Sequence, residues 1–188
     1  MRISVALFYL SLVIISCNNS DRGPDVSNIK IELSTQRFEQ DLFKLDTLNF
    51  TNNLDILQAR YPSFGENFLA TNLNCDPKWP ADTTSNYVRG FINAYRPVYD
   101  TAQIIFKDFT PYEKEIVKGL QFVKHYFPNY REPKKIITYI GPLDGYGDIL
   151  SEDAIIIGLH HHLGKNYSLY KSALVQEIYP GYISNRFE

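Results

Sequence analysis

Three of the four histidines of this chain stand side by side, as His160, His161 and His162. Neutral imidazole is a common zinc ligand, and zinc sites often add a carboxylate oxygen or a thiolate. If the strand before the triplet continued through it, His160 and His162 would lie on one face, because side chains alternate along a strand. A nearby carboxylate could then complete a metal site; the candidates are Asp144, Asp148, Glu152 and Asp153.

No established catalytic motif supports this metal site. The zinc-peptidase signature H-E-x-x-H occurs nowhere in the chain. The loop from Asp144 to Asp148 lacks the spaced ligands of an EF-hand, and Leu150 stands where a dinucleotide fingerprint needs its third glycine. The simpler interpretation is a strand end whose histidines are hydrogen-bonded or solvated, so we expect no catalytic residue, no metal and no other cofactor.

The N-terminus predicts a lipoprotein signal peptide. Arg2 precedes an apolar run from Ile3 to Ile15, which is too short to span a bilayer but typical of a signal peptide. Ser16 and Cys17 follow, as in a bacterial lipobox, although Ile14 stands where leucine is usual. We therefore expect cleavage before Cys17 and lipid attachment to its thiol.

This prediction divides the chain into residues 1–16 as signal peptide, 17–27 as a lipid-anchored tether, and a folded part from residue 28. The tether is polar and carries a Gly-Pro pair, as flexible linkers do. Palmitate-type acyl chains on Cys17 would anchor the protein to the membrane without a spanning helix. Cys75, the second of two cysteines, would then have no disulfide partner. A short N-terminal anchor helix or an ordinary secretory peptide is the alternative.

Composition is that of one globular domain. The chain has 188 residues, of which 44% are hydrophobic and 21% are charged, so it can bury a single sizeable core. Its formal net charge of −2 provides no basic surface for nucleic acid.

The first half is predicted to be mostly helical. Residues 26–33 alternate apolar and polar side chains as a short strand does, and Ser34 or Thr35 could cap the helix that follows. A second helix closes at Pro62, and a loop with two Pro, two Asp and three Ser or Thr residues extends from Asn74 to Ser85.

Three prolines then mark the limits of the next helices. Helical spacing begins at Asn86, and Pro97 should kink or split that helix. Thr110 as N-cap and Pro111 at the first position begin another helix, which Pro128 ends. Its predicted apolar face consists of Ile116, Val117, Leu120, Val123 and Phe127.

The second half predicts a small buried sheet with flanking helices. Residues 134–140 are rich in β-branched side chains, and residues 154–159 show no alternation, as in a strand covered on both faces. A turn-rich loop from Asp144 to Asp148 separates them. Helical stretches follow around residues 167–171 and from Pro180. The fold class is therefore α/β, of the α+β kind.

Several stretches, in this order, resemble the GldB family of gliding motility lipoproteins, over a region from about Ile29 to the end. They are Arg37–Phe43, Tyr61–Phe64, His125–Pro128, Thr138–Gly141, Ile155–Leu159 with Leu163–Gly164, and Tyr179–Ile183 with Arg186–Phe187. The resemblance implies a cell-envelope lipoprotein needed for gliding, tied to type IX secretion and to other envelope lipoproteins of the gliding machinery.

GldB is in turn distantly similar to a family of zinc metallopeptidases, which implies a peptidase-like α/β fold. Because H-E-x-x-H is missing, no catalytic residue carries over from that likeness. Family members continue past the position of Glu188, so we expect the single domain of residues 28–188 to lack a C-terminal part.

Together these features predict a lipid-anchored protein, facing the periplasm, that acts by binding rather than catalysis. Its expected partners are the membrane and other envelope lipoproteins, not nucleic acid. One alternative is a metal-dependent hydrolase that uses His160 and His162. The other is a solute-binding envelope lipoprotein whose exposed aromatic side chains line a pocket.

Overall fold

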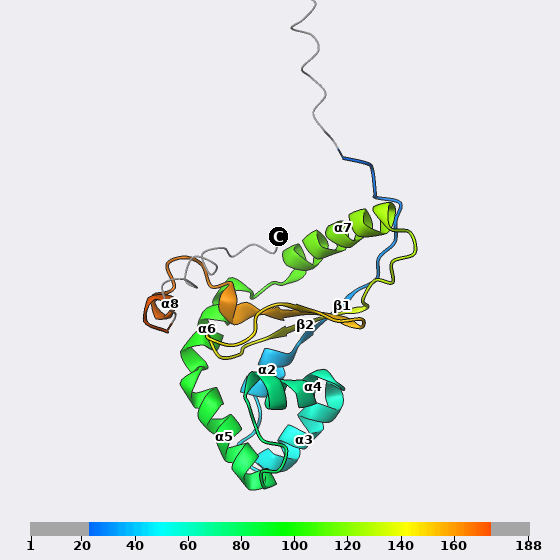
Figure 1. Cartoon of the computed structure of the whole chain (residues 1–188). Coiled ribbons are helices and arrows are strands. Elements are labelled where there is room, and N and C mark those ends of the chain that lie inside the picture. Colours follow the sequence, from blue (N-terminus) through cyan, green and yellow to red (C-terminus); the bar gives the residue numbers. More distant parts are fainter. Residues whose placement is uncertain (1–22, 174–188) are drawn as a thin grey trace, which may run out of the picture.

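A small mixed sheet lies at the centre of the computed structural model, which describes residues 23–173, with side chains up to Tyr170 (Figure 1). Its strand order is β1-β2-β4-β3; the first three strands are parallel and β3 is antiparallel to β4. The strands are β1 (Ser34–Arg37), β2 (Lys135–Tyr139), β3 (Ile149–Leu150) and β4 (Ala154–Gly158). The predicted α/β class is confirmed, as are the strands predicted at 134–140 and 154–159.

Helices cover both faces of this sheet, which is why β4 shows no alternation of apolar and polar residues. One face carries α2 (Phe38–Phe43), α3 (Phe50–Arg60), α4 (Phe64–Asn67), a wide helical turn η2 (Phe68–Asn72) and α5 (Ala81–Ala94). α7 (Thr110–Tyr126) lies across the opposite face, and α6 (Arg96–Ile105) leads to it (Figure 1). A short helix, α8 (Ser168–Ala173), fits the helical stretch predicted at 167–171.

Aromatic rings fill the space between the sheet and the α2–α5 helices. Phe38 meets the rings of Tyr61, Phe64 and Phe68 edge-on, with centroids 5.0, 4.9 and 4.9 Å away. Tyr139 extends the cluster into β2, with its ring centroid 6.0 Å from that of Phe68. Edge-to-face pairs of this kind add to the stabilisation that comes from burying the rings.

The strand predicted at 26–33 is wrong. Residues 26–29 instead form a turn, in which the Ile29 N–H donates to the Val26 carbonyl at 3.0 Å. Strand pairing starts at Ser34, so Ser34 and Thr35, predicted as helix caps, lie in β1. The reason is long-range: the Ser34 N–H donates to the carbonyl of Lys134, which precedes β2.

The split at Pro97 is confirmed, because α5 ends at Ala94 and α6 begins at Arg96. α7 begins at Thr110, but Thr110 is not its N-cap; the Asp108 carboxylate accepts the Thr110 N–H at 2.9 Å. The predicted apolar face of α7 is also wrong at one end. Phe127 is 65% exposed, and Leu120 is the one buried residue of this helix.

Close packing of α4 on α3 requires a glycine. A Cβ atom at Gly65 would lie 2.8 Å from the Cα of Gln58, a backbone atom that cannot move aside. We expect Gly65→Ala to lower the free energy of unfolding by about 1–3 kcal/mol because the helices must separate. Chemical denaturation followed by circular dichroism measures this effect.

The matched control is Gly90→Ala in α5, where a Cβ would meet nothing within 4 Å. Alanine there should raise the free energy of unfolding by about 0.5–1 kcal/mol, since it restricts the unfolded chain and favours the helix. Equal effects at the two positions would contradict the packing of α4 on α3.

Candidate functional site at the histidine turn

The three adjacent histidines form a tight turn, here called the histidine turn (His160–His162), directly after β4. The chain leaves the strand at Gly158 and enters the 3₁₀ turn η3 (Leu159–His161). The prediction that a continuing strand places His160 and His162 on one face is therefore wrong. The turn still lies at the carboxyl ends of parallel strands, where open α/β sheets commonly bind ligands.

Two glycines make room for the His160 ring. A Cβ at Gly158 would lie 2.7 Å from its Cε1 atom, and a Cβ at Gly141 would lie 3.2 Å from the same atom. The ring therefore packs beneath the backbone at the ends of β2 and β4. Its centroid is 5.2 Å from that of Tyr139, which joins it to the aromatic core.

His160 uses both of its ring nitrogens inside the protein. It is fully buried, and its Nδ1 accepts the Gly141 N–H at 3.1 Å. Its Nε2 must then carry the proton, which it donates to the Tyr146 carbonyl at 3.2 Å. Burial, with a smaller contribution from the neighbouring histidines, holds the pKa of His160 well below its usual value. The ring is thus a neutral structural element.

His162 pairs with the one predicted carboxylate that the fold brings to the turn. Its Nε2 lies 2.9 Å from Asp148 Oδ2, while Asp148 Oδ1 accepts the Gly158 N–H at 2.9 Å. Of the other predicted candidates, Glu152 and Asp153 are exposed beyond β3. Among residues 23–173 there is no group of three or more His, Cys, Asp or Glu side chains that could hold a metal ion.

His161 lies between the other two rings and the loop predicted at 144–148, which the structure confirms as a turn. Its ring centroid is 4.1 Å from that of His160, and Gly147 leaves it the space that a Cβ would fill. Burial lowers its pKa to about 4. The Tyr139 hydroxyl fixes the same loop by donating to the carbonyls of Tyr146 and Gly147, at 2.6 and 2.8 Å.

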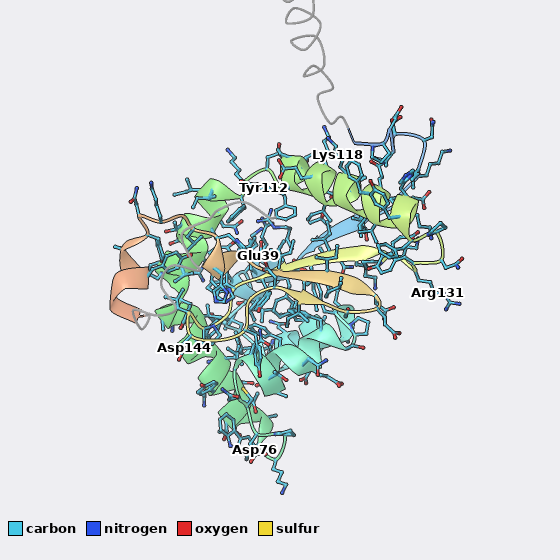
Figure 2. All side chains as sticks on the ribbon, turned by 45° about the horizontal axis from the view of Figure 1, so that its top comes forward. Glu39, Asp76, Tyr112, Lys118, Arg131 and Asp144 are labelled. Atoms are coloured by element: carbon cyan, nitrogen blue, oxygen red, sulfur yellow. The ribbon has the colours of Figure 1, made fainter. Side chains whose placement is uncertain are left out.

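A buried ion pair, which sequence reasoning missed, lies at the carboxyl end of β1. Arg37 Nε donates to Glu39 Oε1 at 2.6 Å, and the Thr138 hydroxyl donates to Glu39 Oε2 at 2.7 Å. The Glu39 carboxylate is fully buried, in the middle of the molecule (Figure 2). The only local signal is two opposite charges flanking Phe38 at a strand end. Through these contacts the Glu39 carboxylate links β1, α2 and β2.

On the face of the sheet that α2–α5 cover, a cavity of about 430 Å³ lies between α3, η2 and α5. Its lining includes the Cys75 thiol and the carboxylates of Asp55, Glu66 and Asp76, but no aromatic side chain. This cavity therefore differs from the aromatic-lined pocket that the solute-binding alternative predicts.

Comparison with known proteins identifies a family. The family model described as gliding motility protein GldB matches residues 19–188. The chain belongs to the GldB family. Membership makes it an envelope-associated gliding motility lipoprotein. No curated protein and no solved structure matches the chain. Within residues 23–173, no helix is long and apolar enough to cross a membrane.

The stretches that resemble GldB contribute contacts around this site. Arg37–Phe43 contributes the ion pair and α2. In Thr138–Gly141, the first residue contacts Glu39 and the last contacts His160. Ile155–Leu159 forms most of β4 and the start of the turn. The Tyr179–Ile183 and Arg186–Phe187 stretches, Cys17 and the helix predicted from Pro180 lie outside the described residues.

The buried neutral histidines predict a pH-dependent stability. The unfolded chain takes up protons on these imidazoles below about pH 6.5, whereas the folded chain holds His161 neutral down to about pH 4. The stability contribution is therefore complete above pH 6.5 and lost as the pH falls. We expect the free energy of unfolding to drop between pH 6.5 and 5, by at most about 1.4 kcal/mol per pH unit for each histidine.

Urea denaturation at several pH values measures this slope, and His161→Gln should reduce it. His125→Gln, at an exposed position of α7, is the matched control for the loss of one imidazole. An unchanged slope in His161→Gln would contradict the assignment.

Proposed function

We propose that this GldB-family protein is a non-catalytic scaffold of the gliding machinery, anchored by lipid at Cys17 and facing the periplasm. Family membership supports the gliding role. Both ring nitrogens of His160 are hydrogen-bonded to backbone groups. This observation favours a scaffold over an enzyme. Its partners would be other envelope lipoproteins of the type IX secretion-linked apparatus.

General acid–base catalysis needs a group that exchanges a proton with a bound substrate. Two of the groups with suitable chemistry at the carboxyl ends of the strands face inward, whereas the Asp148 side chain is 46% exposed. His160 and Glu39 are both fully buried, and each is held by hydrogen bonds. His162 and Asp148 contact each other. This arrangement stabilises the end of the sheet.

The metal-dependent hydrolase remains the alternative. It would require His160 to release the Gly141 N–H or the Tyr146 carbonyl, leaving a buried polar group without its partner. Each such loss costs about 1–3 kcal/mol, which a metal would have to offset.

The anchor is tested by Cys17→Ala in the full-length protein. We expect this variant to lose acyl labelling and membrane association, because the anchor depends on acylation of that thiol. Membrane fractionation and palmitate labelling in cells provide the measurement. Cys75→Ala, which removes the other thiol, is the control and should stay with the membrane. Unchanged membrane association of Cys17→Ala would refute the lipoprotein assignment.

Zinc titration by calorimetry tests the non-catalytic assignment. We expect no heat of binding from the folded protein, because His160 offers no free lone pair. Tight binding that disappears in the His160→Ala, His162→Ala double variant would support the hydrolase instead. His162→Ala alone leaves the buried ring in place and controls for unfolding of the double variant. The scaffold also predicts co-purification with other envelope lipoproteins.

A further inference from the structure

The C-terminal end of α7 exposes two consecutive aromatic residues, Tyr126 and Phe127. Tyr126 is 62% exposed and Phe127 is 65% exposed. They belong to the His125–Pro128 stretch, and the scaffold proposal above gives them no role. Contiguous exposed apolar side chains are a feature of interaction surfaces.

This end of α7 is held rigidly. Lys124 Nζ donates to the Tyr130 carbonyl at 2.6 Å and to Glu132 Oε2 at 3.1 Å, and the Tyr130 N–H donates to the Phe127 carbonyl at 2.9 Å. The His125 ring packs edge-on against Tyr126, with centroids 5.0 Å apart. The two aromatic rings are therefore displayed by a fixed turn and not by a loose loop.

The chain enters the fold beside the same helix. A Cβ at Gly23 would lie 3.6 Å from the Phe122 ring, and Gln121 Nε2 donates to the Ile29 carbonyl at 2.8 Å. Gly23 shares a groove with Lys118 and Phe122. Residues four apart share one side of a helix, so Lys118, Phe122 and Tyr126 form a ridge. The first described residues pass beside α7 near its C-terminal end (Figure 1).

The distance from this ridge to the lipid is short. Gly23 follows Cys17 by six positions, and a chain segment of that length spans at most about 20 Å. A lipid attached at Cys17 would keep the end of α7 close to the bilayer surface at all times. Tethering makes the contact intramolecular, so even weak docking is favoured.

We propose that the α7 ridge, extended by Phe127, docks on the membrane interface. Aromatic rings partition to the headgroup region, and a neighbouring lysine favours anionic lipid. Lys118 lies on the outer side of α7, and Asp76 lies at the opposite end of the molecule (Figure 2). Docking thus directs the α3–α5 helices and their cavity away from the bilayer. This inference rests on the proposed lipid attachment at Cys17.

The test places a tryptophan on the ridge in the full-length, lipidated protein. Trp79, the single native tryptophan, is first replaced by Phe. Phe127→Trp is compared with Leu48→Trp. Leu48 is also an exposed apolar residue, with 72% of its surface exposed, and it precedes α3 on the other face of the sheet. Tyr126→Trp is a second probe in case one substitution disturbs the turn. Circular dichroism checks that each variant folds.

The proteins are reconstituted into phosphatidylethanolamine–phosphatidylglycerol vesicles with brominated acyl chains, which quench nearby indole rings. We expect about a twofold loss of emission at positions 126 and 127, with a blue shift, because interfacial indole rings lie beside the acyl chains. Leu48→Trp should keep its emission.

Vesicle flotation separates the two possible failures. A protein that floats while all three probes emit equally would be anchored but not docked, which overturns this inference alone. A protein that does not float would refute the anchor and, with it, the docking.

Discussion

The buried carboxylate of Glu39 imposes the strictest physical constraint on this fold. A buried charge is tolerated only where opposite charge and hydrogen bonds compensate it, and loss of one partner costs about 3–5 kcal/mol. Arg37 compensates Glu39 from β1, and Thr138 does so from β2. Arg37 also donates to the Phe106 carbonyl and lies over the Phe109 ring. The corner of β1 and α2, the middle of the sheet and the turn between α6 and α7 must therefore assemble together.

That requirement brings together distant parts of the chain. Glu39 and Thr138 are 99 positions apart, and the helices α2 to α7 all lie between β1 and β2. Closing so long a connection costs entropy that only the completed core offsets. Phe38, next to both charged residues, is the ring on which Tyr61, Phe64 and Phe68 converge. One tripeptide thus supplies both the polar and the aromatic centre of the fold.

Patterns within a short stretch of sequence predicted the elements that depend only on neighbouring residues. α3, the break at Pro97, β2 and β4 could be read from spacing, proline and β-branched content. β1 could not, because its pairing partner lies about a hundred positions further on, and neither could the Glu39 ion pair. The prediction for the histidine turn was wrong because it assumed that the strand continues to His162. Gly141 and Gly158 instead leave a space that the His160 ring fills. The prediction that Phe127 is part of the apolar face was wrong, because helical periodicity shows which residues share a face but not whether another element covers that face.

The same two misreadings bear most directly on function. At the carboxyl ends of the strands, where an enzyme of this class would expose its reactive groups, His160 and Glu39 are enclosed and satisfied. At the C-terminal end of α7, where Phe127 was expected to face the core, Tyr126 and Phe127 are exposed to solvent. The buried His160 and Glu39 and the exposed Tyr126 and Phe127 support the proposal that this protein acts by binding. Since the chain enters the fold beside those exposed rings, a lipid anchor would bring that apolar surface to the membrane first.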